Sequence, residues 1–182
     1  MANVGNWIKL TDILNEIISE VGDLENIEPY EFDYDSWESS FYTEDGDLVV
    51  MRTENETDKL RSLLTASKIF EKEKNEIYNI SFEVNGVDTQ AKKTTLQEFI
   101  KILKTVSIYA KNELERINSG LTREDKPIFI IGAQSKKSSE LKSDPQKIAL
   151  YANIISKNLP DNYRTQEGKV LRLPVILIQR IK

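Results

Sequence analysis

Three carboxylates recur at every second position in one short stretch of the chain, at Glu31, Asp33 and Asp35. In a β-strand this spacing places the three side chains on one face, where carboxylate oxygens could bind magnesium or calcium or serve a two-carboxylate hydrolase. Neither an EF-hand spacing nor a second carboxylate motif accompanies them. We therefore interpret the three acids as a solvated strand face or a contact surface, and we predict no catalytic residue, metal site or cofactor.

A group of lysines forms a second candidate site. Lys136, Lys137 and Lys142 lie in a serine-rich loop, and Lys147 follows soon after in a predicted helix. The free N–H groups at the start of that helix could receive a phosphate. However, the chain has no glycine-rich phosphate-binding pattern and no aromatic residues between the lysines, as single-strand binders would use for stacking. A solvated loop is our interpretation, and nucleic-acid binding is the alternative.

Two aromatic side chains, Trp37 and Tyr42, lie among acids and serines. Aromatic residues are enriched both in protein interfaces and in cores. The pair could form an exposed contact patch, or it could close one end of the sheet. The sequence leaves both alternatives open.

The composition removes several classes of function. The chain of 182 residues contains no Cys and no His, which excludes disulfides, thiol nucleophiles, Ser-His-Asp triads and most zinc sites. It is 39% hydrophobic and 30% charged, which is typical of a globular protein, and no apolar run approaches the ~20 residues of a membrane span. The N-terminus does not resemble a signal peptide. We expect a non-enzymatic, single-domain protein of the cytoplasm.

The charge is distributed unevenly along the chain. Residues 1–60 carry sixteen acids and three bases, a net charge of −13, whereas the other residues carry a net charge of +8. Such asymmetry is a pointer to an interaction surface. It predicts protein partners, and it would permit a head-to-tail homo-oligomer in which the acidic surface of one copy contacts the basic surface of the next.

An amphipathic helix followed by an apolar strand is expected to organise the fold. In residues 94–120 the apolar side chains recur at steps of three and four, as on one face of a helix. Residues 127–133 are apolar without alternation, which predicts a central strand buried on both faces. Leu103 and Val106 should therefore be buried between the helix and the sheet.

The remaining elements follow from periodicity and turn signals. Asp45-Gly46 predicts a hairpin, and Pro174 suggests a bulge in the last strand or its break into two pieces on an edge. The expected elements are an N-terminal helix within 1–27, strands at 28–35, 41–43, 48–51, 77–84 and 170–181, a helical insertion at 57–74, and a helix at 144–159. Together they predict one α+β domain, with a mixed sheet of about five to six strands covered by amphipathic helices.

The order of these pieces resembles a loosely defined set of small tailed-bacteriophage proteins. The resemblance covers residues 28–159 and rests on Pro29-Tyr30-Glu31-Phe32, the hairpin 41–50, the strand 78–84, Thr105-Val106, the strand 128–133 and Leu150-Tyr151. This chain departs from the pattern by its insertion at 57–74 and by Lys147, where an arginine is expected. The resemblance implies a phage origin more than an activity, and it carries no catalytic residues. We expect a virion component or assembly factor, located in the virion or the host cytoplasm, and the alternative is a nucleic-acid-binding or host-modulating phage protein.

Overall fold

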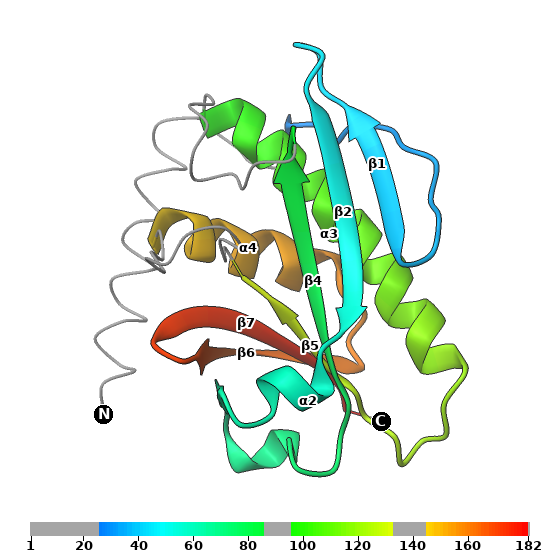
Figure 1. Cartoon of the computed structure of the whole chain (residues 1–182). Coiled ribbons are helices and arrows are strands. Elements are labelled where there is room, and N and C mark those ends of the chain that lie inside the picture. Colours follow the sequence, from blue (N-terminus) through cyan, green and yellow to red (C-terminus); the bar gives the residue numbers. More distant parts are fainter. Residues whose placement is uncertain (1–25, 86–95, 133–144, 182) are drawn as a thin grey trace.

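The computed structural model describes residues 26–85, 96–132 and 145–181. Its central strand is β5 (Ile128–Ile131), which is buried on both faces as its sequence predicts. β5 lies fourth in a sheet of seven strands with the order β1-β2-β4-β5-β7-β6-β3. It pairs parallel with β4 and antiparallel with β7, and all other neighbours are antiparallel. The fold is α+β with a mixed sheet (Figure 1).

The sheet has more strands than the five or six that the sequence predicts. Besides β5 they are β1 (Glu38–Tyr42), β2 (Leu48–Asn55), β3 (Leu64–Thr65), β4 (Ile77–Val84), β6 (Tyr163–Val170) and β7 (Leu173–Arg180). The two missed strands are β3, which has only two residues, and β6, whose sequence YRTQEGKV has no apolar alternation. The predicted Asp45-Gly46 hairpin is confirmed between β1 and β2, with Gly46 at φ +84°.

Two helices cover one face of the sheet. The chain crosses from β4 to the parallel β5 through α3 (Leu96–Ser119), and α4 (Pro145–Asn158) packs against α3. The predicted burial of Leu103 and Val106 is confirmed, since each is 1% exposed in the main core. Within the described residues, neither helix is apolar over a length that would span a membrane.

The predicted insertion at 57–74 covers part of the opposite face (Figure 1). Only its first turn is α-helical, as α2 (Thr57–Leu60), and it continues through β3 and a short 3₁₀ helix, η2 (Lys68–Phe70). Its apolar side chains, Leu60, Leu64 and Phe70, are buried in a second core against β4, β5 and β7. Because β3 pairs with β6, sheet pairing and burial determine the conformation of this segment, rather than helical periodicity.

The strand predicted at 28–35 is wrong. This segment lies along α3 with no assigned strand, and the hydrogen bond of its Tyr30 N–H goes to the Thr105 hydroxyl of α3. The alternation that predicted a strand has another cause, because Tyr30 and Phe32 pack against the main core while Glu31 and Asp33 are exposed. The helix predicted within 1–27 falls almost entirely outside the described residues.

Pro174 does not mark an edge or a break. It lies near the start of β7, an inner strand between β5 and β6, and pairs with Lys169 of β6. β5 pairs only with the later residues Ile176, Leu177 and Ile178 of β7. The missing N–H of Pro174 therefore costs no hydrogen bond to β5.

Candidate functional site

The segment that carries the three predicted carboxylates is held along α3. We call residues 27–37 the acidic arm. At its start, Lys104 Nζ donates to the Ile27 carbonyl at 2.6 Å and the Tyr30 N–H donates to Thr105 Oγ1 at 2.8 Å. The Tyr30 hydroxyl donates to Glu98 at 2.6 Å. The start of the arm is therefore fixed to the first half of α3 through both its backbone and a side chain.

The ring of Tyr30 ties the arm to the hairpin as well. It stacks on Phe41 of β1 with ring centroids 5.2 Å apart, and Lys101 Nζ of α3 lies 4.3 Å from its centroid. The same lysine forms a salt bridge of 2.8 Å with Glu44. Helix, arm and hairpin thus meet at Tyr30.

A buried carboxylate holds the other end of the arm. Glu113 of α3 is 0% exposed, and it accepts hydrogen bonds from the Trp37 N–H and the Tyr34 hydroxyl. Arg116 Nε donates to it at 2.6 Å. A buried charge is costly unless it is paired and hydrogen-bonded, and Glu113 meets both conditions. We call Glu113 and its donors the Glu113 hub.

Tyr109 links the hub to the sheet. Its hydroxyl lies 2.8 Å from the Trp37 carbonyl, 2.9 Å from Thr53 Oγ1 of β2 and 3.1 Å from Glu113 Oε1. Having one proton, it can donate to one of the two acceptors while it accepts from Thr53. The hub therefore fixes the position at which the chain enters β1.

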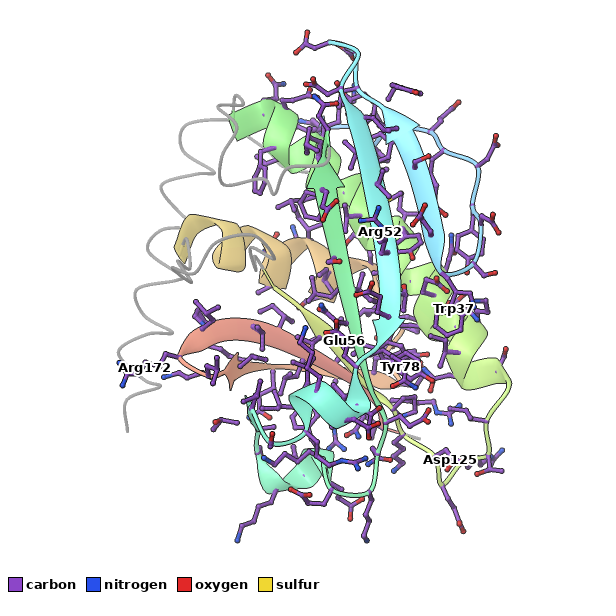
Figure 2. All side chains as sticks on the ribbon, viewed as in Figure 1. Trp37, Arg52, Glu56, Tyr78, Asp125 and Arg172 are labelled. Carbon is purple, nitrogen blue, oxygen red and sulfur yellow. The ribbon has the colours of Figure 1, made fainter. Side chains whose placement is uncertain are left out.

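Trp37 has an unusual backbone conformation for a bulky residue. Its φ is +69°, in the left-handed region, which costs energy and persists only where the surroundings enforce it. Here the enforcing contacts are the hydrogen bond from the Trp37 N–H to Glu113 and the stacking of the Arg116 guanidinium, 4.2 Å from the ring centroid. Trp37 and Tyr78 lie near one another at one end of the sheet, with rings 6.2 Å apart (Figure 2).

With the arm held in this way, its carboxylates are directed to solvent. Glu28, Glu31, Asp33 and Asp35 are all exposed, and none has an ion pair among the residues that the structure describes. Glu28, Glu31 and Asp33 line a shallow depression of about 680 Å³, with Phe32 and Ile108 as its apolar parts. The arm thus presents negative charge beside a small apolar floor.

The two predicted aromatic residues do not form one patch. Trp37 is 45% exposed and precedes β1, whereas Tyr42 is 68% exposed and ends it. At about 3.3 Å per residue, their backbones are roughly 16 Å apart. Lys136, Lys137 and Lys142 lie outside the described residues, so the predicted basic loop stays a prediction.

The sequence did not reveal the hub. Tyr109, Glu113 and Arg116 follow one another at steps of four and three, beside the apolar stripe of α3. This pattern is typical of an exposed ion pair on a helix, and only the packing of the arm over it makes it internal. The tyrosines of the arm were the available signal, since a buried Tyr hydroxyl usually has a polar partner.

Acidic side chains do not gather into a metal site anywhere in the described ranges. A second depression, of about 490 Å³, lies at the end of β2 and is lined by Asn55, Glu56, Asp58, Lys59 and Glu76. It combines three acids with Lys59 of the short helix α2. No other group in its lining points to a ligand. The arm and the adjacent β1 are therefore the stronger candidate surface.

No protein-family model, curated protein or solved structure matches the chain. The resemblance to tailed-phage proteins stays a prediction.

The tyrosines that anchor the arm predict a loss of stability in alkali. Burial and then the hydrogen bond to Glu98 raise the pKa of Tyr30 to about 12, and burial and then the charge of Glu113 raise the pKa of Tyr34. A raised folded-state pKa contributes stability below the unfolded value of about 10, and that contribution is lost as the pH rises through the folded value. We expect the free energy of unfolding to fall between pH about 10 and pH about 12.

Urea unfolding over this pH range measures the effect, with Tyr30→Phe as the matched variant. The variant cannot ionise at this position, so its stability should fall less steeply with pH than that of the wild type. Equal slopes would show that the raised pKa of Tyr30 contributes nothing to stability.

Proposed function

We propose that this chain is a non-enzymatic binding protein that contacts a basic surface of a protein partner through the acidic arm and β1. The observation that carries this proposal is the charge of the surface. Residues 28–47 contain eight acids and no lysine or arginine. In the arm, the acids face solvent while the tyrosines between them hold the backbone to α3.

The way the arm is held favours binding. An irregular segment that orders only on binding loses conformational entropy at that moment, which reduces affinity. The arm is fixed at Tyr30 and again at Trp37 before any partner arrives. Charged groups in fixed positions also attract an oppositely charged partner and orient its approach.

The resemblance to tailed-phage proteins suggests which partner to seek. We propose another phage protein, met in the virion or during its assembly. Mass spectrometry of purified particles tests this directly, because a virion component is retained in them at a constant ratio to other structural proteins. An assembly factor is found only in lysates of infected cells.

The proposed contact predicts that neutralising the arm weakens partner binding. The variant Glu31→Gln, Asp33→Asn, Asp35→Asn removes three charges that have no ion pair among the described residues, so the fold should be retained. Because such charges act mainly on encounter and are screened over about 8 Å at physiological salt, we expect a slower association rate and a weaker salt dependence. Surface plasmon resonance of a short lysine-rich peptide over the immobilised protein measures both.

A matched control removes three exposed acids elsewhere, as Glu73→Gln, Glu124→Gln, Asp161→Asn. It has the same net charge as the arm variant, so any difference between them reports position rather than total charge. Equal binding by the two variants would contradict a specific role for the arm.

Two alternatives give different results in these measurements. Nucleic-acid binding would require the lysine loop, and the acidic arm would repel DNA from its own side of the molecule. Head-to-tail association of copies would appear in light scattering as a mass that falls when salt is added, because it would depend on the charge asymmetry of the chain.

A further inference from the structure

The open side of β1 has backbone groups free for pairing. β1 is the first strand of the sheet and pairs only with β2. The Trp37 carbonyl accepts from the Thr53 N–H, and the Thr43 N–H donates to the Asp47 carbonyl. Since residues in an antiparallel pair alternate between bonded and non-bonded positions, the backbone groups of Glu38, Ser40 and Tyr42 point away from β2.

These three residues are also accessible. Their side chains are exposed, while Ser39 and Phe41 between them are buried. Among the described residues, no hydrogen bond occupies the backbone N–H or carbonyl of Glu38, Ser40 or Tyr42. Figure 1 shows β1 as the outermost strand of the sheet, and the acidic arm runs down on its outer side without forming a strand.

The opposite edge of the sheet, at β3, has features that usually prevent pairing with a further strand. β3 has only two residues, and Lys72 Nζ donates to the Leu64 carbonyl at 2.7 Å. Natural edge strands are commonly protected by shortness, proline, lysine or bulges. β1 has five residues with no proline, lysine or bulge. β1 is therefore an edge at which another strand can be added.

The charge around β1 determines which strand fits. The arm and the hairpin tip carry acids on both sides of it, including Asp35 before the strand and Asp45 after it. A second copy that paired through its own β1 would bring two acidic arms together, which like-charge repulsion disfavours. An extended segment with basic side chains would gain both the backbone bonds and the charge attraction.

We infer that the partner docks as an added β-strand on β1, through an extended basic segment whose backbone pairs with Glu38, Ser40 and Tyr42. This inference rests on the proposed function and specifies its mode of binding. Main-chain pairing supplies affinity, and the arm selects basic segments over neutral or acidic ones.

The variant Ser40→Pro tests the mode of binding. Proline removes the central outward N–H and places its ring on the open edge, and because this N–H does not bond β2, the sheet should be retained. Ser40→Ala is the matched control, since it also loses the hydroxyl but keeps the N–H. The probe is an alternating lysine–valine peptide of about eight residues, long enough to span β1.

We expect wild type and Ser40→Ala to bind the peptide alike and Ser40→Pro to bind it about tenfold more weakly. The same peptide with D-valine has the same charge but cannot form a regular strand. It should therefore bind to all three proteins as weakly as the L peptide binds to Ser40→Pro. Equal binding of the L peptide by Ser40→Pro, or of both peptides by the wild type, overturns strand addition. If the arm variant still lowers binding in that case, the proposed function stands without this mode.

Hydrogen exchange provides a measurement that does not depend on the proline variant. When the L peptide is bound to the wild type, the amides of Ser40 and Tyr42 should exchange more slowly, whereas those of β3 at the other edge should not change. Unchanged exchange at Ser40 and Tyr42 under saturating peptide overturns the inference, even if Ser40→Pro does not fold. Failure of the wild type to bind any lysine-rich peptide overturns both this inference and the proposed function.

Discussion

Replacing Glu113 with alanine should lower the free energy of unfolding by about 3 kcal/mol, the lower end of the cost of breaking a buried ion pair. The carboxylate is fully buried and accepts hydrogen bonds from Trp37, Tyr34 and Arg116. Alanine leaves these donors without their acceptor. Because Arg116 is 30% exposed at its side chain, water can rehydrate it, and we therefore expect the lower end of the range.

Glu113→Gln is the matched control. It keeps the size of the side chain and one acceptor oxygen, but it loses the charge that pairs with Arg116. We expect an intermediate loss of about 1 to 2 kcal/mol. Chemical denaturation of the wild type, Glu113→Ala and Glu113→Gln measures the differences in the free energy of unfolding directly. A loss below about 0.5 kcal/mol for Glu113→Ala, which is typical of surface positions, would show that the hub does not hold the arm.

The alanine variant should also release the end of the arm. The chain has two tryptophans, Trp7 and Trp37, so fluorescence in a Trp7→Phe background reports Trp37 alone. Its indole stacks on Arg116 in the structure, and freeing it should increase its quenching by added iodide. The peptide that binds β1 should then bind more weakly, because Trp37 no longer fixes the start of that strand. Unchanged quenching would show that the Glu113 hub does not determine the position of Trp37.

The sequence predicted correctly those parts of the fold in which the pattern of residues is compatible with only one kind of structure. The apolar run of β5 is too short and too continuous for an amphipathic helix, and it is buried on both faces. The stripe along α3 repeats over many turns and places Leu103 and Val106 in the core. At the hairpin, the turn chemistry of Asp45-Gly46 fixes the connection.

The arm shows why alternation alone is not enough. Aromatic residues and acids alternate from Tyr30 to Asp35, and Tyr30 and Phe32 turn inward to the main core, whereas Tyr34 is 40% exposed. Any extended segment has this alternation, whether it pairs in a sheet or lies on a helix. Its hydrogen-bond partners decide between the two, and here they are the side chains Thr105 and Glu113 of α3. Partners so distant in the sequence cannot be predicted from local pattern.

The sequence predicted only part of the candidate surface, because the rest depends on contacts between residues that are distant in the sequence. Exposure of Glu31, Asp33 and Asp35 follows from their charge, and the structure has all three exposed. The positions of Trp37 and Tyr42 at opposite ends of β1 depend on where that strand begins, which the hub determines. The open edge depends on the strand order of the whole sheet, which a single sequence does not contain.

Leu103→Ala is expected to cost about 2 to 5 kcal/mol of folding stability, as a large-to-small change in a packed core. Leu103 is 1% exposed and lies in α3 over the sheet. Alanine and leucine are both good helix formers, so the loss reports packing rather than helix propensity.

The matched control is Leu171→Ala, in the turn between β6 and β7. Leu171 is 53% exposed, and its positive φ of 57° strains leucine and alanine alike because both have a Cβ. The same atoms are removed in both variants, so the difference in their urea midpoints isolates burial, with a change within about 0.5 kcal/mol expected for Leu171→Ala. Equal midpoints for the two variants would contradict the packing of α3 on the sheet. The support that α3 gives to the acidic arm through Thr105 and Glu113 would then lose its basis.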